Sequence, residues 1–519
     1  MPIYLFSLPC PSIMAILKRC TFKGASLLEE RGLVVLKFFI HWFRANSVIL
    51  INTSSLVGAT AITSGLGFIY WWVAARWFPP EAIGIASASI SAVTLLGNMS
   101  MLGLGTLLIT ELPRNSRQSG SMISTALLVV GALGVLVGCV FALIASHIST
   151  GFQPLGAEPI DTLTFAAGVG FSAITLVLDQ ALIGLLKGGL QFWRNAFFAV
   201  LKLAALLVVN WWPSNQPGMK IYATWMVSSG ISLGLIAANV VLRRNWRSKS
   251  YRPRWYLLHK LGLAAIQHHM LNLTLLAPTQ LLPVLVTFML SARMNAWFYV
   301  AWMIACVIFI FPGALTTVLH ATNAAQQTTL ARKARLTIGI SLLVALLANL
   351  VLQIGTQQIL GIFGKAYANE AAWCLRLLIL AAFPLTVKNH YISICRIQDR
   401  IMTAMIAMIP GGLLELGAAA LGAHAYGLLG LSLGWIIAIC IEAIFMFPTV
   451  YKVIRSVQPT MIQTQIEWAT IQPVDVWQLD TRPLPTINMQ ESLWLAETLP
   501  IPAVQSGYSK ETRQPSSFY

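Results

Sequence analysis

Twelve long apolar segments joined by short polar turns limit the folds open to this chain. They span residues 48–77, 82–110, 121–148, 162–186, 195–211, 220–242, 261–290, 295–319, 336–360, 371–393, 402–422 and 429–451. An α-helix rises about 1.5 Å per residue, so most of these segments can cross about 30 Å of hydrocarbon. A content of 57% hydrophobic and 10% charged residues agrees with a lipid solvent. The sequence therefore predicts an all-α, polytopic membrane protein with about twelve transmembrane helices.

Lys and Arg residues concentrate in the turns on one side of these segments. If Met1 and Tyr519 share a side, the opposite turns carry only Arg76, Lys220, Arg293 and Lys365. The turns on the shared side carry Lys18, Arg19, Lys23, Arg31, Lys37, Arg44, Arg114, Arg117, Lys187, Arg194, Arg243, Arg244, Arg247, Lys249, Arg252, Arg254, Lys260, Arg332, Lys333, Arg335, Arg396, Arg400, Lys452 and Arg455. By the positive-inside rule, both termini are expected in the cytoplasm. The net charge of +17 is thus a topology signal, and no nucleic-acid partner is expected.

The longest and most basic internal turn, RRNWRSKSYRPRWYLLHK at 243–260, divides the chain. Six apolar segments precede it and six follow, which is typical of two lobes related by an axis along the membrane normal. We expect a cytoplasmic N-terminal segment at 1–47, lobes at 48–242 and 261–453, the linker at 243–260, and a polar tail at 454–519. The Pro, Thr, Gln and Ser content of the tail predicts cytoplasmic disorder. Residues 1–17 are either a membrane-surface segment or the product of a misread start codon.

Ionisable residues inside apolar segments are costly and must face protein, water or substrate. Asp179 and Lys202 lie at similar depth on neighbouring segments, so we expect them to pair, either as a structural lock or in ion coupling. Glu415 and Glu442 could share a proton, because like charges raise the pKa of one carboxyl group. They could equally be neutral packing residues. The seven cysteines show no paired metal-ligand spacing, so neither a zinc site nor a cofactor is expected.

Polar residues on three segments are candidates to line a substrate cavity. Gly and Pro interruptions often mark the binding site of a transporter, and such interruptions accompany polar groups in 48–77 and 261–290. Basic residues in 371–393 could neutralise a phosphate, or could simply reach the headgroup layers. Headgroup contact is also an alternative for the histidine in this set. The candidates are Asn52, Ser55, His268, Asn272, Gln280, Arg376 and Lys388.

Four stretches resemble a known family. They are SLVGATAITSGLGFIYWWVAARWFPPEAIGIASASIS at 55–91, GLGTLLITELPR at 103–114, IFGKAYANEAAWCLRLLILAAFP at 362–384 and YGLLGLSLGW at 426–435. A glycine-containing first helix that leads through Ala-Arg and Pro-Glu-x-x-Gly into the second is similar to the polysaccharide-biosynthesis (O-antigen type) flippases. These belong to the multidrug/oligosaccharidyl-lipid/polysaccharide (MOP) exporter superfamily. The resemblance covers about 48–453.

The resemblance implies two six-helix bundles that form a V around a central cavity. Such bacterial proteins flip undecaprenyl-diphosphate-linked oligosaccharide from the inner to the outer leaflet of the cytoplasmic membrane by alternating access. Membrane lipids, a glycan polymerase and glycosyltransferases are the partners that this implies. The family supplies no catalytic motif to transfer residue by residue.

Two alternatives to a flippase are weaker. A drug/cation antiporter of the same superfamily should bring acidic residues into its binding lobe, yet the stretch between Val48 and Glu111 holds only Glu81, in a turn. A membrane glycan polymerase or ligase usually has a large external loop, whereas every expected external turn here is short. No nucleophile–base pair appears in the sequence. We therefore expect a transporter and no enzyme.

Overall fold

The computed structural model describes residues 47–115, 118–209, 216–242, 252–253, 255, 263–323 and 330–456. They lie within one compact unit, Met1–Gln458. In the first helix the side chains are described only from residue 62 onward. The expected N-terminal segment and polar tail, and most of the basic linker, fall outside the described residues.

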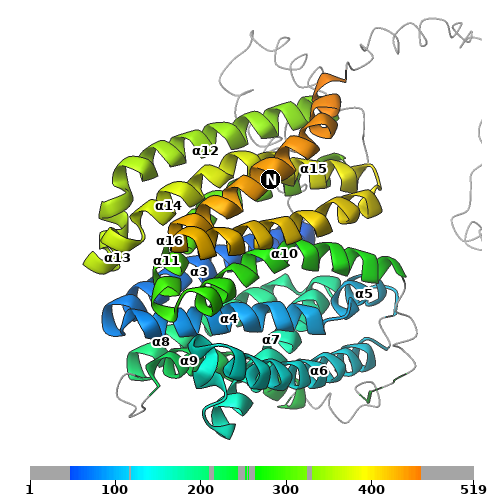
Figure 1. The fold of residues 1–519 in the computed structure, drawn as a ribbon. Helices are drawn as coiled ribbons and strands as arrows, with labels where there is room; N and C mark the ends of the chain where they lie inside the picture. The colour runs from blue at the N-terminus through cyan, green and yellow to red at the C-terminus, as the bar shows by residue number, and fades with distance from the viewer. Residues whose placement is uncertain are drawn as a thin grey trace, which may run out of the picture. The chain divides into compact units, whose positions relative to one another are not determined.

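The first six predicted segments are all helical (Figure 1). The third, fourth and sixth closely match their predicted bounds, whereas the fifth begins seven residues before its predicted start. The elements are α3 (Ser47–Trp77), α4 (Pro80–Ser100), α5 (Leu104–Glu111), α6 (Ser119–Ile148), the 3-10 helix η3 (Thr150–Leu155), α7 (Pro159–Gly184), α8 (Gly188–Val209) and α9 (Pro217–Leu242).

The second six segments are helical as well. Their elements are α10 (Leu263–Met289), α11 (Ala292–Asn323), α12 (Leu330–Gly361), α13 (Lys365–Glu370), α14 (Ala372–Leu378), η8 (Ile379–Ala381), α15 (Ala382–Ile397) and α16 (Ile401–Arg455). The last of these contains two predicted segments, because the backbone leaves helical geometry at Tyr426 and Gly427. Gly427 has a φ of 60°, a left-handed value that glycine adopts without steric cost.

Ten helices in the described part of the chain are long and apolar enough to cross a membrane. That number counts α16 once although it holds two segments, and it omits α3, whose first half has no described side chains. Counting α16 as two segments and including α3 gives twelve. The prediction of an all-α membrane protein with two six-helix lobes is confirmed.

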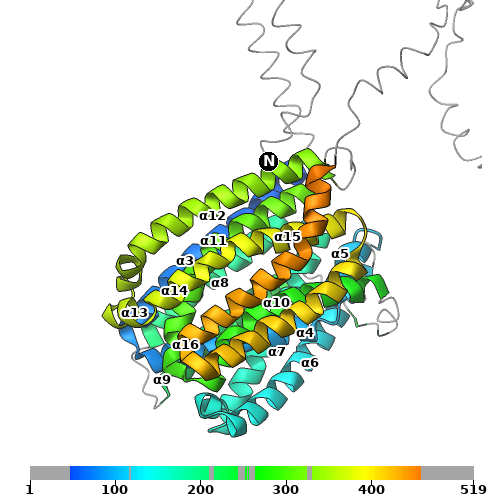
Figure 2. The ribbon, with the colours of Figure 1, turned by 45° about the horizontal axis from the view of Figure 1, so that its top comes forward.

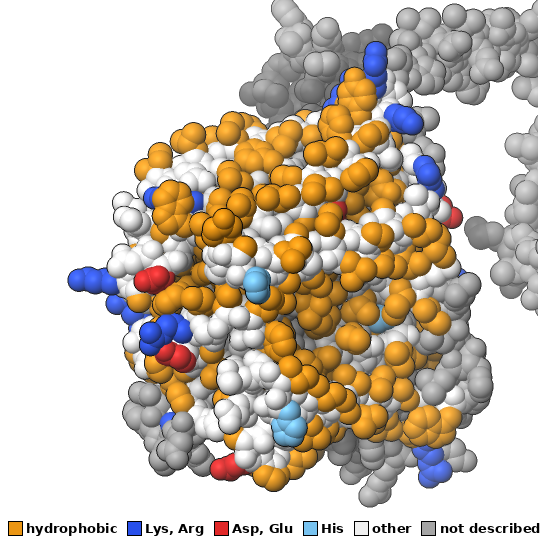
Figure 3. All heavy atoms as spheres, in the orientation of Figure 1, with side chains coloured by type: hydrophobic (Ala, Val, Ile, Leu, Met, Phe, Trp, Pro, Cys, Tyr) orange, Lys and Arg blue, Asp and Glu red, His pale blue; other side chains and the backbone are white. Residues whose placement is uncertain are grey.

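The lateral surface of the bundle is apolar. On α12, Leu343, Leu347, Val351 and Ile354 are all more than half exposed, at the three- and four-residue spacing of one helix face. Figure 3 shows hydrophobic side chains over most of one face, with charged side chains toward its left and right edges. Such a surface is unfavourable in water and suits a hydrocarbon environment.

The two lobes meet mainly through α4, which packs against α10 and α11 (Figures 1 and 2). One cluster of buried apolar side chains crosses this boundary, with Tyr70 and Ile83 from the first lobe and Phe298, Trp302 and Trp435 from the second. We call the bundle end with the turns 78–79, 290–291 and 362–364 the predicted external end. The end with the turns 112–118 and 398–400 is the predicted cytoplasmic end.

Candidate functional site

A cavity of about 370 Å³ lies between the lobes. The first lobe contributes residues of α3 and α4 to its wall, and the second contributes residues of α10 and α11. We call it the inter-lobe cavity, and it is lined by Ser64, Gly67, Phe68, Trp71, Ile90, Ser91, Thr94, Thr279, Gln280, Tyr299, Trp302, Met303, Cys306, Val307 and Ile310. Its volume lies in the range usual for sites that hold small polar molecules or parts of larger ones.

Aromatic rings and small polar groups share this wall. The rings of Trp71 and Tyr299 meet edge to face across the lobes, with centroids 4.8 Å apart. Hydroxyl groups come from Ser64 and Ser91, and an amide from Gln280. None of the described lining residues is acidic or basic. Rings can pack on the faces of sugars while hydroxyls and amides exchange hydrogen bonds with them, so the chemistry suits an uncharged polar ligand portion.

A lysine lies directly beside this wall. The Nζ atom of Lys202 on α8 is 3.8 Å from the position that a Cβ on Gly67 would take. Its ammonium group also lies 5.4 Å from the ring centroids of Tyr70 and Phe198, where the negative faces of the rings attract it. No ion pair joins Lys202 to a carboxylate of the described residues. The inter-lobe cavity therefore has an uncompensated positive charge at its first-lobe side.

The expected Asp179–Lys202 pair does not form. Arg194 Nη2 donates to Asp179 Oδ2 at 2.8 Å and to Asn195 Oδ1 at 2.7 Å. Arg194 was expected in the turn before the apolar segment 195–211. The helix in fact begins at Gly188, which places Arg194 inside it, with its side chain only 2% exposed.

A polar row continues from the cavity along α10. Thr279 lines the cavity. Asn272 and His268 precede it by seven and eleven residues and lie on the same face of α10. Both Asn272 and His268 are exposed. The Nη2 atom of Arg396, at the end of α15, donates to Asn272 Oδ1 at 3.0 Å. Three of the proposed cavity residues, His268, Asn272 and Gln280, thus lie in or next to the inter-lobe region.

Lys388 lies elsewhere, buried inside the second lobe. Its Nζ atom is 2.5 Å from Glu415 Oε1 and 2.8 Å from Glu442 Oε2. Lys388 is not among the residues that line the inter-lobe cavity. The two carboxylates do come together, as expected, but with a lysine between them. Trp435 Nε1 donates to Glu415 Oε2 at 2.7 Å and completes the cluster.

The other candidates on these helices have different outcomes. Arg376 holds its guanidinium 5.0 Å from the ring centroid of Trp373 and is not among the residues that line the inter-lobe cavity. Asn52 and Ser55 belong to α3, but their side chains fall outside the part of the chain that the structure describes.

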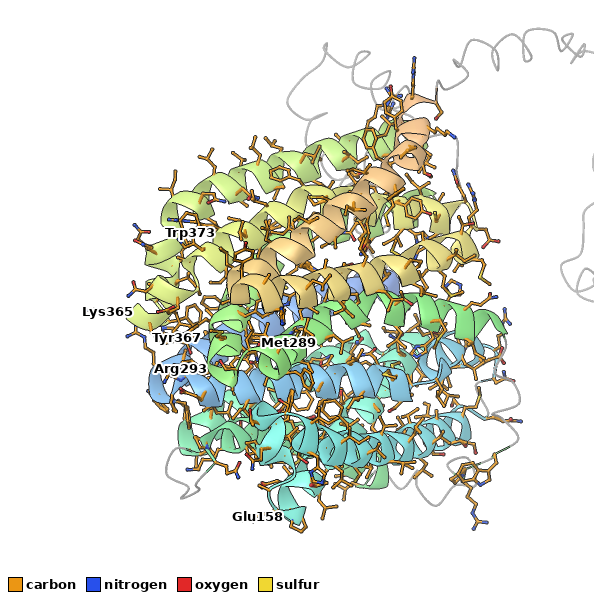
Figure 4. The ribbon with its side chains drawn as sticks, in the orientation of Figure 1. Glu158, Met289, Arg293, Lys365, Tyr367 and Trp373 are labelled. Carbon is orange, nitrogen blue, oxygen red and sulfur yellow. The ribbon has the colours of Figure 1, made fainter. Side chains whose placement is uncertain are left out.

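Contacts between the lobes close the predicted external end. Arg293 Nε lies 2.5 Å from Glu81 Oε1, and Asn295 Nδ2 donates to the carbonyl oxygen of Gly84 at 2.8 Å. From the first lobe to the second, Arg76 Nη2 donates to the carbonyl oxygen of Ile362 at 2.7 Å. Figure 4 shows Arg293, Lys365 and Tyr367 gathered at this end. We call these contacts the external latch.

The latch was not predicted from the sequence, although its residues belong to a recognisable motif. Pro79 and Pro80 begin α4, and Glu81 follows in the first turn, where an acidic group suits the positive helix end. Arg76 and Arg293 are among the few basic residues in the expected external turns. Arg76 lies in the last turn of α3 and Arg293 in the first turn of α11, and each side chain reaches into the other lobe. The presence of an arginine in turns that are otherwise poor in basic residues was the signal that could have identified them.

Comparison with known proteins agrees with this geometry. An inward-facing multidrug resistance MATE family transporter of the MOP superfamily superposes with a TM-score of 0.62 at 15% identity, over 77% of this chain and 98% of that chain. The outward-facing conformation of a transporter described in the same words gives 0.53 at 14%, over 78% and 96%. A MOP superfamily transporter from Pyrococcus furiosus gives 0.50 at 13%, over 78% and 95%. These likenesses establish the fold alone, and no curated protein matches the chain.

The family model described as polysaccharide biosynthesis protein matches residues 49–320, more than half of the chain. This match covers the whole first lobe and the helices α10 and α11, which form the second-lobe wall of the inter-lobe cavity. The chain is thus a multi-pass membrane protein with the fold of the MOP superfamily transporters named above. The chain belongs to the polysaccharide biosynthesis protein family.

Proposed function

We propose that this protein flips a lipid-linked oligosaccharide, carried on undecaprenyl diphosphate, from the inner to the outer leaflet of a bacterial cytoplasmic membrane. One observation carries the proposal: the inter-lobe cavity combines aromatic and hydroxyl groups with an uncompensated cation, Lys202. The glycan then serves cell-surface polysaccharide synthesis. Glycosyltransferases would supply it on the cytoplasmic side, where both termini would lie, and a polymerase would consume it outside.

The physical task of such a transporter is to replace water around a polar headgroup. The free energy of moving a sugar hydroxyl into hydrocarbon without a hydrogen-bond partner is unfavourable by roughly several kcal/mol. For a diphosphate the cost is far larger. Ser91, Thr94 and Gln280 offer partners for hydroxyls, and Lys202 offers a counter-charge for a phosphate. The polyprenyl tail can stay in the bilayer, because only the headgroup needs the cavity.

The route to the cavity follows from the two ends of the bundle. The external latch joins the lobes at the predicted external end. The polar row of Thr279, Asn272 and His268 leads from the cavity toward the predicted cytoplasmic end, where Arg396 adds a second cation. A headgroup that entered along this row would meet positive charge at the start and at the cavity wall. Opening of the latch would then release it outside.

The same cavity argues against an organic cation as substrate. A drug cation in a low-dielectric site needs a carboxylate or a similar counter-charge. None of the described lining residues supplies a carboxylate, and Lys202 beside the cavity would repel the cation.

Delivery of the glycan to the outer leaflet tests the proposal. In a host deleted for this gene and for redundant flippases, lipid-linked glycan should remain in the inner leaflet, and the full-length protein should restore surface polysaccharide. Lys202→Met should reduce restoration about 10-fold or more, since hydrogen bonds to charged groups contribute roughly 1.5–3 kcal/mol. Lys202→Arg should retain part of it.

A matched pair of variants on α3 controls for general damage. Gly67→Val places a side chain between Lys202 and the cavity, whereas Gly65→Val enters space with no atom within 4 Å of its Cβ. Only the first should reduce delivery. Normal outer-leaflet delivery in the deleted host would sink the flippase proposal. Full delivery by Lys202→Met would remove the observation on which it rests.

A further inference from the structure

The rings of Trp71 and Tyr299 lie at the external side of the inter-lobe cavity. Helix α3 runs toward the predicted external end, and α11 runs away from it. Among the lining residues, Trp71 is the last on α3 and Tyr299 is the first on α11. The first lobe supplies one ring and the second lobe the other, with centroids 4.8 Å apart. This contact between the lobes therefore lies between the cavity and the external latch.

The external latch begins about one helical turn beyond this pair on both helices. On α3, Arg76 follows Trp71 by five residues and donates to a backbone carbonyl of the second lobe. On α11, Asn295 precedes Tyr299 by four residues, is buried and donates to the carbonyl oxygen of Gly84. Because packed helices move as units, a change in the distance between the two rings also changes the distances within the latch.

A phosphate beside Lys202 does not open the latch by itself. The ammonium group of Lys202 lies next to Gly67 and near the rings of Tyr70 and Phe198, which all belong to the first lobe. An ion pair with this lysine is therefore the same whether the lobes are together or apart. A ligand shifts an equilibrium only by the difference between its affinities for the two states, so this ion pair favours neither.

A sugar bonded to such a phosphate reaches the ring pair. Gly67 precedes Trp71 by four residues, which corresponds to about 6 Å along the helix axis. The faces of aromatic rings carry partial negative charge and repel phosphate oxygens, whereas the C–H groups of a sugar pack against them. The sugar is thus the part of the ligand that can enter between Trp71 and Tyr299.

A sugar in this place is incompatible with the closed latch. Van der Waals contacts of about 3.5–4 Å on both sides of a sugar hold the two rings about 7–8 Å apart. The centroid distance of 4.8 Å must then grow by roughly 2–3 Å. The hydrogen bond from Asn295 to the carbonyl oxygen of Gly84, now 2.8 Å, is lost after such a shift, because N–H···O bonds rarely exceed about 3.2 Å.

We propose that the Trp71–Tyr299 pair distinguishes a lipid carrier that bears sugar from one that does not. A sugar ring that enters between the two side chains opens the external latch, whereas the polyprenyl diphosphate alone leaves it closed. The protein then exports the loaded carrier and retains the empty one, although both present the same phosphates to Lys202. This inference rests on the proposed function and adds to it the part of the ligand that triggers opening.

Spin-label distances on the full-length protein in lipid nanodiscs test the inference. The labels replace the exposed Trp77 of α3 and Trp373 of α14, in a background without the native cysteines. The probes are undecaprenyl diphosphate and the lipid-linked glycan extracted from the host deleted for its flippases. Native mass spectrometry measures the binding of each probe. Both probes should bind, and only the glycan-linked one should add a longer distance.

Variants of the two rings separate their role from general packing. Trp71→Leu and Tyr299→Leu should each raise the ratio of open to closed latch about 2- to 10-fold without ligand, which is the usual contribution of an aromatic pair. Their combination should raise it no further, since both remove the same contact. Trp71→Phe keeps a ring and should stay closer to the wild type. Phe141→Leu is the control, because Phe141 stacks on Phe165 within the first lobe.

The outcomes separate this inference from the proposed function. If both probes bind and give the same distances, short or long, the inference is wrong and the flippase proposal stands. Additive effects of the two leucine variants would likewise overturn it, because the rings would then act separately. A glycan-linked probe that does not bind would refute the proposed function and the inference together.

Discussion

The substitution Gly84→Ala should force the external latch open. A Cβ on Gly84 would lie 1.6 Å from the carbonyl oxygen of Ala292, whereas carbon and oxygen normally approach to about 3.3 Å. The clash is with backbone on both sides, so α4 and α11 must separate by roughly 1.7 Å. The hydrogen bond from Asn295 Nδ2 to the carbonyl oxygen of Gly84, now 2.8 Å, then stretches beyond its useful range.

The expected change in the equilibrium between closed and open latch follows from these contacts. A buried polar group left without a partner costs roughly 1–3 kcal/mol, and overpacking costs roughly 1–3 kcal/mol more. The closed state should therefore lose about 2–6 kcal/mol relative to the open one. This corresponds to roughly 30-fold to 20,000-fold in the population ratio.

Spin-label distances at the predicted external end measure this equilibrium. Labels replace Trp77 at the end of α3 and Trp373 at the start of α14, which are 48% and 63% exposed, in a background without the native cysteines. The unaltered latch should give one short distance, and Gly84→Ala should add a longer population. Gly65→Ala, which meets no atom within 4 Å, is the control. A folded Gly84→Ala protein with an unchanged distance distribution would refute the steric argument.

Two further predictions concern hydrogen bonds inside the lobes. Asp179→Asn should lower the free energy of unfolding in detergent by about 3–5 kcal/mol, because it leaves the buried Arg194 charge without its carboxylate; exchanging Asp179 and Lys202 should not rescue it, and rescue would mean that these two do pair. Trp435→Phe keeps the ring but removes the donor to Glu415, so the same measurement should fall by about 1.5–3 kcal/mol; an unchanged value would show that this hydrogen bond contributes nothing.

Depth in the membrane was readable from the sequence, but the direction of side chains was not. Counting residues placed Asp179 and Lys202 at similar depth, and both do lie within helices. Their partners depend on how α7 and α8 are rotated about their own axes. That rotation is set by tertiary packing, because a segment that is apolar on most faces has little directional pattern. The structure accordingly pairs Asp179 with Arg194, a residue assigned to a turn.

Close backbone contacts escaped the sequence analysis for a similar reason. Gly84 belongs to the Pro-Glu-x-x-Gly motif, and Gly411 to the stretch Pro410-Gly411-Gly412 of α16. Neither motif indicates which group lies where a Cβ would be. For Gly84 it is a backbone carbonyl, and for Gly411 it is a carboxyl group. The twelve helices, by contrast, follow from apolar length alone, which needs no knowledge of neighbours.

The charged groups within the two lobes are balanced differently. Arg194 and Asp179 neutralise each other, so they contribute structure and no net charge. Lys202 lacks a carboxylate in the described first lobe and lies beside the inter-lobe cavity, whereas the second-lobe cluster has one carboxylate in excess. Under the proposed function, a phosphate of the bound ligand neutralises Lys202. The ligand then lowers the cost of holding this charge inside the low-dielectric membrane while the lobes rock.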